Sequence, residues 1–313
     1  MHLLIPFASA HSDAASQVLR DLALPNLAAV LSRLAPTAHD DAGADTFTPP
    51  HERALAAAAG WQGSDGCLPF GAQAAGRDGI VVGTQAWGLV TPCHWQVGRN
   101  HVTLADPAVL ELTEAESRAA FEAVRGLFES EGFRFEWGAS SRWYAAHENF
   151  VDMPCASLDR VIGRNVEAWM RGSEARSVAA KLVRRLQSEW QLLLYPHALN
   201  DEREQRGAPT LNSFWLSGCG RAQAEARVPL QVDASLRAPL LADDWAAWAD
   251  AWRALDAGPI AALLASSRAG DPVALTLCGE RGAHRFESAP QSLWRKLGSR
   301  FRPVEPHAVL EAL

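Results

Sequence analysis

The chain has 313 residues, of which 48% are hydrophobic and 21% charged, a globular balance that excludes extended disorder. Its 36 acidic and 29 basic residues give a formal net charge of −7. Binding to nucleic acid depends on a basic surface, so no nucleic-acid partner is expected. The five cysteines are scattered, odd in number and never arranged as CxxC, which predicts reduced thiols and no zinc site. The chain starts without the basic and apolar segments of a signal peptide and has no long apolar run, so we expect a cytoplasmic protein without a membrane partner.

The first half of the chain is predicted to mix strands and helices. An apolar run at residues 2–7 predicts a buried strand, and a proline in the first turn of an apolar pattern predicts a helix over residues 24–34. Segments 36–50 and 62–79 are rich in Gly, Pro or polar residues and are predicted to be loops on either side of a short helix at 54–59. Alternation over residues 86–104 predicts two or three strands with a turn at 98–100. Thr113 and Glu116 form a capping-box pattern that starts a helix ending near Ser130, and residues 133–137 and 142–146 predict a strand pair.

The second half continues this mixture. Apolar spacing predicts helices over residues 155–170 and 174–195, a strand at 211–216 and a tight loop at 217–220. A helix with a tryptophan stripe is expected after Asp243 or Asp244, another from Pro259, strands at 273–277 and 284–286, and a last helix at 292–300. The predicted fold class is α/β, with a mixed sheet flanked by helices. We expect one compact unit over residues 1–313, with two lobes (1–85 plus 221–313, and 86–220) as the alternative.

Four stretches carry a resemblance to known proteins. They are Leu24–Leu27 (LPNL), Trp87–Pro107 (WGLVTPCHWQVGRNHVTLADP), His197–Arg206 (HALNDEREQR) and Leu211–Gly220 (LNSFWLSGCG). With them the chain resembles an uncharacterised proteobacterial family labelled "regulatory protein, RpfE type" or "phosphoglycerate mutase-like". That family is distantly similar to the archaeal-type cofactor-independent phosphoglycerate mutases of the alkaline phosphatase superfamily. The resemblance implies a degenerate fold of that superfamily.

The chain departs from the mutase pattern where that family binds two catalytic metals. The family has an aspartate directly after its first strand and an Asp-His pair on a late strand. Here the first strand continues into Pro6, Phe7 and Ala8, and the late strand reads Leu275–Glu280 (LTLCGE). Two-metal phosphoryl transfer needs converging carboxylates and histidines. The resemblance therefore implies a fold without this chemistry, and no cofactor or metal is expected.

A first candidate site lies between His94 and His101. If the segment folds back as a hairpin, the two imidazoles could face one another, and Arg99 could add a phosphate-binding guanidinium. The alternative is a strand pair with surface histidines, because no third metal ligand is evident nearby.

Further candidates lie in the last two resembling stretches. Gly218, Cys219 and Gly220 follow a predicted strand and could form an anion-binding nest, or could simply allow a sharp turn. A polar cluster before that strand could bind a phosphorylated ligand or could be a solvated loop with local ion pairs. Its members are Asp201, Arg203, Arg206 and, at the strand itself, Asn212.

Two functions follow from these observations. The first is a non-enzymatic binding or regulatory protein for a small phosphorylated ligand or a protein partner. The second is a metal-dependent phosphoryl-transfer enzyme, a phosphomutase or phosphatase, with an altered active site. The second function requires His94, the two arginines and the Gly218 loop to converge on one pocket.

Overall fold

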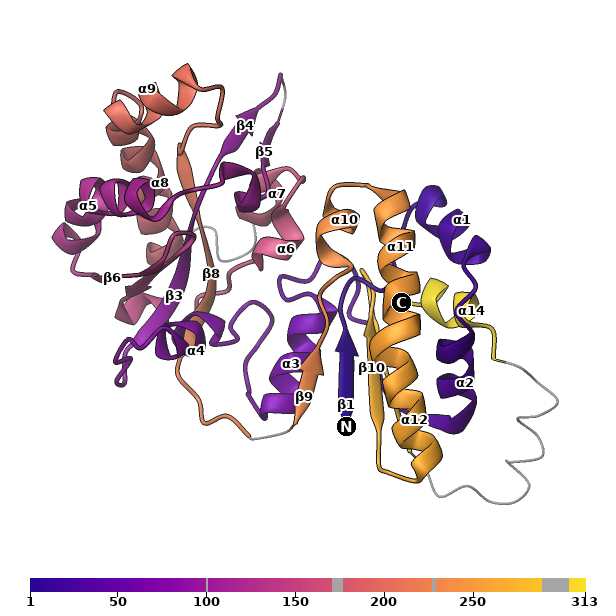
Figure 1. The fold of residues 1–313 in the computed structure, drawn as a ribbon. Helices are drawn as coiled ribbons and strands as arrows, with labels where there is room; N and C mark the ends of the chain where they lie inside the picture. The colour runs from indigo at the N-terminus through magenta and orange to yellow at the C-terminus, as the bar shows by residue number, and fades with distance from the viewer. Residues whose placement is uncertain (100, 171–176, 227–228, 289–303) are drawn as a thin grey trace. The chain divides into compact units, whose positions relative to one another are not determined.

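The computed structural model describes residues 1–99, 101–170, 177–226, 229–288 and 304–313. It divides the chain into two compact units (Figure 1). Unit 1 consists of Met1–Asp45, Pro49–Ala59 and Ala226–Leu313, and unit 2 of Thr46–Thr48 and Gly60–Glu225. The helix expected at residues 292–300 lies outside the described residues.

Unit 1 is built on a mixed five-stranded sheet in the order β2-β11-β10-β1-β9. Its strands are β1 (His2–Ile5), β2 (Leu34–Asp40), β9 (Leu230–Val232), β10 (Ala274–Cys278) and β11 (Ala283–Ser288). The central strand β1 pairs in parallel with β10 on one side and β9 on the other. Strand β11 runs antiparallel to both β10 and β2, as the hairpin expected near residues 273–286 requires.

Helices cover both faces of this sheet, and the alternation of side chains along β1 explains why. Leu3 and Ile5 point to one face, where they pack with Trp248 and Trp252. Leu4 points to the other face and packs near Leu55. The helices of unit 1 are α1 (Asp13–Asp21), α2 (Pro25–Arg33), α3 (Pro50–Ala59), α10 (Arg237–Leu241), α11 (Trp245–Leu255), α12 (Ala261–Ala269) and α14 (Pro306–Glu311).

Two expectations for unit 1 are wrong. Part of the loop predicted over residues 36–50 is strand β2, which tolerates Pro36 because it lies at the sheet edge and pairs only with β11. The predicted helix start at Pro259 is instead a π-helical turn, Asp256–Ile260, that joins α11 to α12. The two helices follow one another as a single column in Figure 1. The wider turn accommodates a proline that has no N–H to donate.

Unit 2 contains an antiparallel sheet in the order β6-β7-β3-β8 and a separate hairpin of β4 and β5. The strands are β3 (Ala86–Cys93), β4 (Trp95–Val97), β5 (Val102–Leu104), β6 (Arg134–Ala139), β7 (Arg142–Ala146) and β8 (Ser213–Arg221). Its helices are α4 (Phe70–Arg77), α5 (Glu114–Ser130), α6 (Leu158–Val161), α7 (Val166–Met170), α8 (Val178–Leu194) and α9 (Ala198–Gln205).

An aromatic core joins the sheet of unit 2 to α5 and α8. Phe128 stacks on Phe135 with ring centroids 4.0 Å apart, and Trp143 lies 5.4 Å from Trp190. The opposite face of the sheet is covered by α4, where Ala72 and its neighbours pack on buried sheet residues. Both units are therefore helix–sheet–helix layers, and the expected α/β class with a mixed sheet flanked by helices is confirmed.

Three sequence expectations for unit 2 are corrected. The loop predicted at 62–79 contains α4, whose Gly71 lets the helix approach the backbone of β3. Helix 155–170 is split into α6 and α7. Because α4 packs on β3 and β8, residues 60–85 belong to unit 2 and not to the lobe of residues 1–85.

Candidate functional site

The β4–β5 hairpin forms as expected, but it separates the two histidines that the sequence suggested could face one another. The register pairs Trp95 with Leu104 and Val97 with Val102. His94 therefore lies at the base of the hairpin, where its carbonyl accepts from Ala105 N at 3.0 Å. His101 lies exposed in the turn, and so does Arg99. The expectation that His94 and His101 form one site is wrong.

His94 and Asn212 instead join the hairpin to the start of β8. His94 Nδ1 donates to the carbonyl of Thr210 at 2.7 Å. The Asn212 side chain accepts from Trp95 N at 2.7 Å and donates to Trp95 O at 3.0 Å. The side-chain amide of Asn212 thus bonds the backbone of Trp95 as a neighbouring strand would. Both the donor and the acceptor of this amide are used within the protein.

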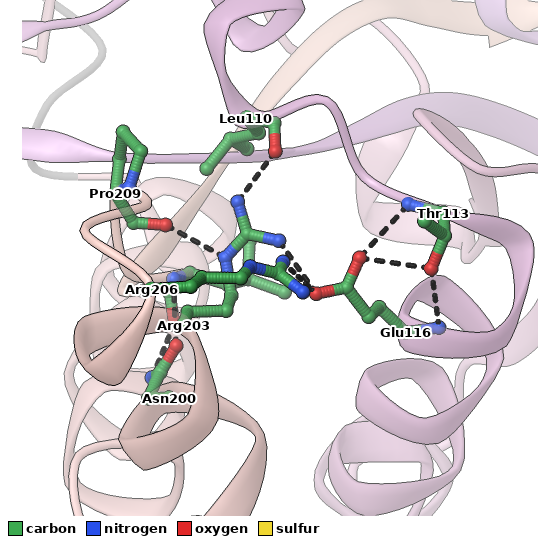
Figure 2. Close-up of polar contacts among 8 residues, drawn as sticks. Leu110, Thr113, Glu116, Asn200, Arg203, Arg206 and Pro209 are labelled. Carbon is green, nitrogen blue, oxygen red and sulfur yellow. Dashed lines mark hydrogen bonds and ion pairs between the residues drawn. The ribbon is translucent and has the colours of Figure 1, made fainter.

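The arginine cluster is an internal network, shown in Figure 2. Arg203 on α9 is fully buried. Its guanidinium donates to Pro209 O at 2.7 Å and Leu110 O at 2.5 Å, and forms an ion pair with Glu116 at 2.8 Å. Arg206 reaches the same carboxylate from solvent. Arg203 is therefore not available to a phosphorylated ligand, and its prediction as a binding residue is corrected.

Glu116 is the centre of this network. It sits at the start of α5 in the expected capping box, where it accepts from Thr113 N at 3.0 Å and Thr113 Oγ1 at 2.8 Å. Burial alone would raise the pKa of Glu116, but the hydrogen bonds from Thr113, Arg206 and Arg203 outweigh it and lower the pKa to about 2. The carboxylate joins α5 to α9, and the neighbouring Asp201 is exposed to solvent.

The Gly218-Cys219-Gly220 segment is part of strand β8 and not a loop after it. Its pairing with β3 shifts register between Trp87 and Leu89, which is a β-bulge. Gly218 has a φ of +63°, and a Cβ there would lie 2.8 Å from the amide nitrogen of Gly71. The glycines thus allow the bulge and the close contact with α4, and no anion-binding loop is formed.

The predicted site residues at the two ends of β8 do not converge. Cys93, next to His94, pairs with Ser213, whereas Gly218 lies five residues further along the strand. At about 3.3 Å per residue, Ser213 and Gly218 are roughly 16 Å apart along β8, and His94 lies beyond the Ser213 end. Among the described residues, no group of three or more His, Cys, Asp and Glu side chains could hold a metal ion.

A pocket elsewhere in unit 2 has the composition of a ligand site. It is partly open to solvent, and its cavity volume is about 80 Å³. The wall combines aromatic, sulfur-containing and aliphatic side chains with a few polar ones. The described lining residues are Phe47, Met153, Pro154, Cys155, Ala156, Trp169, Met170, Ser177, Ala180, Val183, Arg184, Gln187, Trp215 and Leu216.

Gln187 gives this pocket a polar group that the protein does not satisfy. The side chain is 4% exposed, and its Nε2 donates to Phe214 O at 3.1 Å. Its Oε1 is buried and has no hydrogen-bond partner. A buried carbonyl without a partner is unfavourable by about 1–3 kcal/mol, so a donor from a bound molecule would stabilise it.

This pocket is not visible in the sequence, because its wall comes from segments far apart in the chain. Gln187 interrupts the apolar face of α8 between Val183 and Trp190, and a polar residue on an apolar face was the one available signal. Met153–Ala156 carries no periodic pattern that would place it beside that face.

No family model matches the chain, and no curated protein matches it. Several solved structures are similar to it, among them the following two. The cofactor-independent phosphoglycerate mutase from Thermoplasma acidophilum DSM 1728 has a TM-score of 0.36 and 13% identity, with 93% of this chain and 90% of that chain covered. The PH0037 protein from Pyrococcus horikoshii has a TM-score of 0.45 and 11% identity, with 92% and 87% covered. In the described part of the chain, no helix combines the length and apolarity that crossing a bilayer requires.

Proposed function

We propose that this chain is a small-molecule-binding protein whose ligand occupies the pocket of unit 2. The observation that carries the proposal is that Gln187, whose buried Oε1 has no hydrogen-bond partner, lines a pocket whose wall is mostly apolar. This function is the binding or regulatory role expected from the sequence, and the RpfE-type affiliation stays a prediction.

The lining defines the chemical class of the ligand. Trp169 and Trp215 offer aromatic surfaces on which a flat ring can stack. The flexible thioethers of Met153 and Met170 can contact the edge of such a ring. Gln187 Oε1 is an acceptor without a donor in the protein. A flat apolar ring system that carries one N–H or O–H donor meets these requirements.

The phosphoryl-transfer alternative has less support. It required His94, Arg203 and the Gly218 segment to converge. His94 lies beyond the Ser213 end of β8, and Gly218 is roughly 16 Å from Ser213 along that strand. Arg203 is buried and bound to protein acceptors. The expectation of a phosphorylated ligand rested on these residues, so the apolar ligand replaces it in the proposal.

Calorimetric titration with indole and benzothiophene tests the proposal. The two rings have nearly the same shape, but only indole has an N–H. We expect indole to bind about tenfold more tightly, because a tenfold difference corresponds to the 1.4 kcal/mol of one hydrogen bond to an otherwise unpaired acceptor.

Two variants on α8 locate the binding site. Ala180→Phe fills the pocket and should abolish indole binding. The matched control is Leu192→Phe, which adds the same ring type at a position on the same helix that is 76% exposed, and it should bind indole normally. Equal binding of indole by both variants would place the ligand elsewhere and contradict the proposal.

A further inference from the structure

Two buried thiols lie side by side in unit 2, and one of them, Cys155, lines this pocket. The Sγ atoms of Cys155 and Cys219 are 3.5 Å apart. A disulfide bond is about 2.05 Å long, so the sulfurs need to approach by roughly 1.5 Å to form one. Cys155 is 9% exposed and Cys219 is fully buried.

The surrounding backbone holds the two cysteines against each other. Cys155 N donates to Gly66 O at 2.9 Å, and Trp215 Nε1 donates to Ala156 O at 2.8 Å, which ties the segment of Cys155 to β8. On the other side, the backbone of Gly88 lies so close that a Cβ there would be 2.9 Å from Cys219 Sγ. Strand β3 therefore restricts movement of the Cys219 side chain away from Cys155.

The two thiols differ in access. Cys155 lines the pocket, so a small oxidant that enters the pocket meets this thiol first. Burial, together with the adjacent Cys155, raises the pKa of Cys219 well above its ordinary value. Cys219 therefore fits the role of the second thiol, which reacts with an already oxidised Cys155.

We propose that Cys155 and Cys219 form a modification site, at which a peroxide oxidises the pair to a disulfide. Cys155 sulfur attacks one peroxide oxygen, the O–O bond breaks, and a sulfenic acid and one water are formed. Cys219 sulfur then attacks the sulfenic sulfur, the S–S bond forms, the S–O bond breaks, and the hydroxyl leaves as water with the thiol proton. The two thiols lose two electrons, and hydrogen peroxide is reduced to two waters.

Oxidation has a consequence for the ligand pocket. Drawing Cys155 toward β8 moves the wall segment from Met153 to Ala156, so the disulfide reduces indole affinity. This consequence rests on the proposed function, whereas the formation of the disulfide does not.

Mass spectrometry of the full chain tests the disulfide directly. The protein is treated with hydrogen peroxide, denatured in N-ethylmaleimide to label the remaining thiols, and digested. We expect a peptide pair linked through Cys155 and Cys219. The N-ethylmaleimide labels on these two cysteines should disappear together after oxidation and return when the protein is reduced with dithiothreitol before labelling. In Cys219→Ala, Cys155 should accumulate as a sulfenic acid that dimedone captures. The matched control Cys93→Ala changes another fully buried thiol and should leave the link unchanged.

Several results would overturn the inference. Cys67 is a half-buried neighbour, and a link between Cys67 and Cys155 would show that Cys219 is not the partner. Persistence of both labels on Cys155 and Cys219 would show that the pair does not oxidise. A missing link in protein that binds indole contradicts this inference alone, and a link in protein that binds neither indole nor benzothiophene contradicts the proposed function alone.

Discussion

Asp256 Oδ1 accepts a hydrogen bond of 2.7 Å from the amide of Leu27, a residue 229 positions away in the chain. Its Oδ2 accepts from the amide of Asn26 at 3.2 Å, and Pro25 occupies the first turn of the same helix. The carboxylate thus caps α2 from the π-helical turn after α11, where the free amides and the positive end of the helix dipole favour an anion. The Pro25-Asn26-Leu27 segment, which carried part of the family resemblance, is held by an internal tertiary cap in this protein.

Removal of this cap should destabilise unit 1. Asp256 is 5% exposed, so Asp256→Ala leaves the buried amide of Leu27 and the partly buried amide of Asn26 without this acceptor and should lower the free energy of unfolding by about 2–3 kcal/mol. Asp256→Asn keeps an acceptor and should cost less. Urea denaturation measures both. The control is Asp244→Ala, which removes the exposed local cap of α11 and should cost about 1 kcal/mol. An equal loss in the two alanine variants would show that burial of the tertiary cap is unimportant.

Gly218 should tolerate no side chain. Its φ of +63° costs an L-residue about 1–2 kcal/mol, and a Cβ would lie 2.8 Å from Gly71 N. Gly218→Ala should therefore lose more than about 3 kcal/mol of unfolding free energy, since it adds overpacking to backbone strain. Gly207 separates the two effects, because its φ is +72° and nothing lies within 4 Å of the added Cβ. Comparable melting temperatures for Gly218→Ala and Gly207→Ala would contradict the close approach of α4 to β8.

The sequence predicts those elements whose signals are local. The capping box of Thr113 and Glu116 forms as predicted, and of the two predicted caps Asp243 and Asp244 the second is used. The strands predicted within residues 86–104 and at 133–137 and 142–146 form as well. Each of these signals lies within a few consecutive residues. Elements that depend on tertiary contacts were missed. Strand β2 forms through its pairing with β11, and α4 retains Gly71 because β3 lies against it.

The same reasoning applies to the candidate site. Arg203 looked like a phosphate ligand because its sequence neighbours are polar, and its burial results from Glu116, 87 residues earlier. Gln187 and Cys155 were not singled out, because their proximity to Trp215 and Cys219 depends on how α8 and Met153–Ala156 pack on β8. Residue types are visible in a sequence, whereas the partners that satisfy them are not.

His2 should make the stability of unit 1 depend on pH. Burial, with a contribution from Arg285, lowers the pKa of His2 to about 4 in the folded protein, below the ordinary value of 6.5. The unfolded chain therefore binds a proton at this residue between pH 6.5 and 4 and the folded chain does not, so stability falls as the pH falls through this range. The loss amounts to at most about 3 kcal/mol for a shift of this size.

Substitution of His2 isolates this contribution. His2→Gln removes the titrating group, and its amide can still bond Thr276, which His2 Nε2 contacts at 2.8 Å. Urea denaturation at pH 6.5 and pH 4 should show a smaller difference in this variant than in the unchanged protein. The exposed His101→Gln serves as the control and should keep the full difference. A pH dependence that survives His2→Gln would assign the effect to other groups.

Glu116 should make the stability of unit 2 depend on pH in a second, more acidic pH range. Its folded pKa of about 2 lies below the ordinary value of 4.5, so its contribution is complete above pH 4.5 and is lost as the pH falls toward 2. Glu116→Gln should flatten the stability of unit 2 over this interval. Glu114→Gln, which changes an exposed carboxylate two residues away, should not flatten it.

The two arginines that share Glu116 should differ strongly in their contribution. Arg203 is fully buried, and Arg203→Met leaves the carboxylate with fewer partners, which should cost about 3–5 kcal/mol. The Arg206 side chain is 50% exposed, so Arg206→Met should cost less than about 1 kcal/mol although it contacts the same oxygen. Each arginine variant is combined with Glu116→Gln, and urea denaturation of the single and double variants is compared. The comparison gives the coupling energy of each arginine with Glu116. Because a buried pair is screened less than an exposed one, added salt should weaken the Arg206 coupling and leave the Arg203 coupling nearly unchanged. Equal couplings would show that burial does not distinguish the two ion pairs.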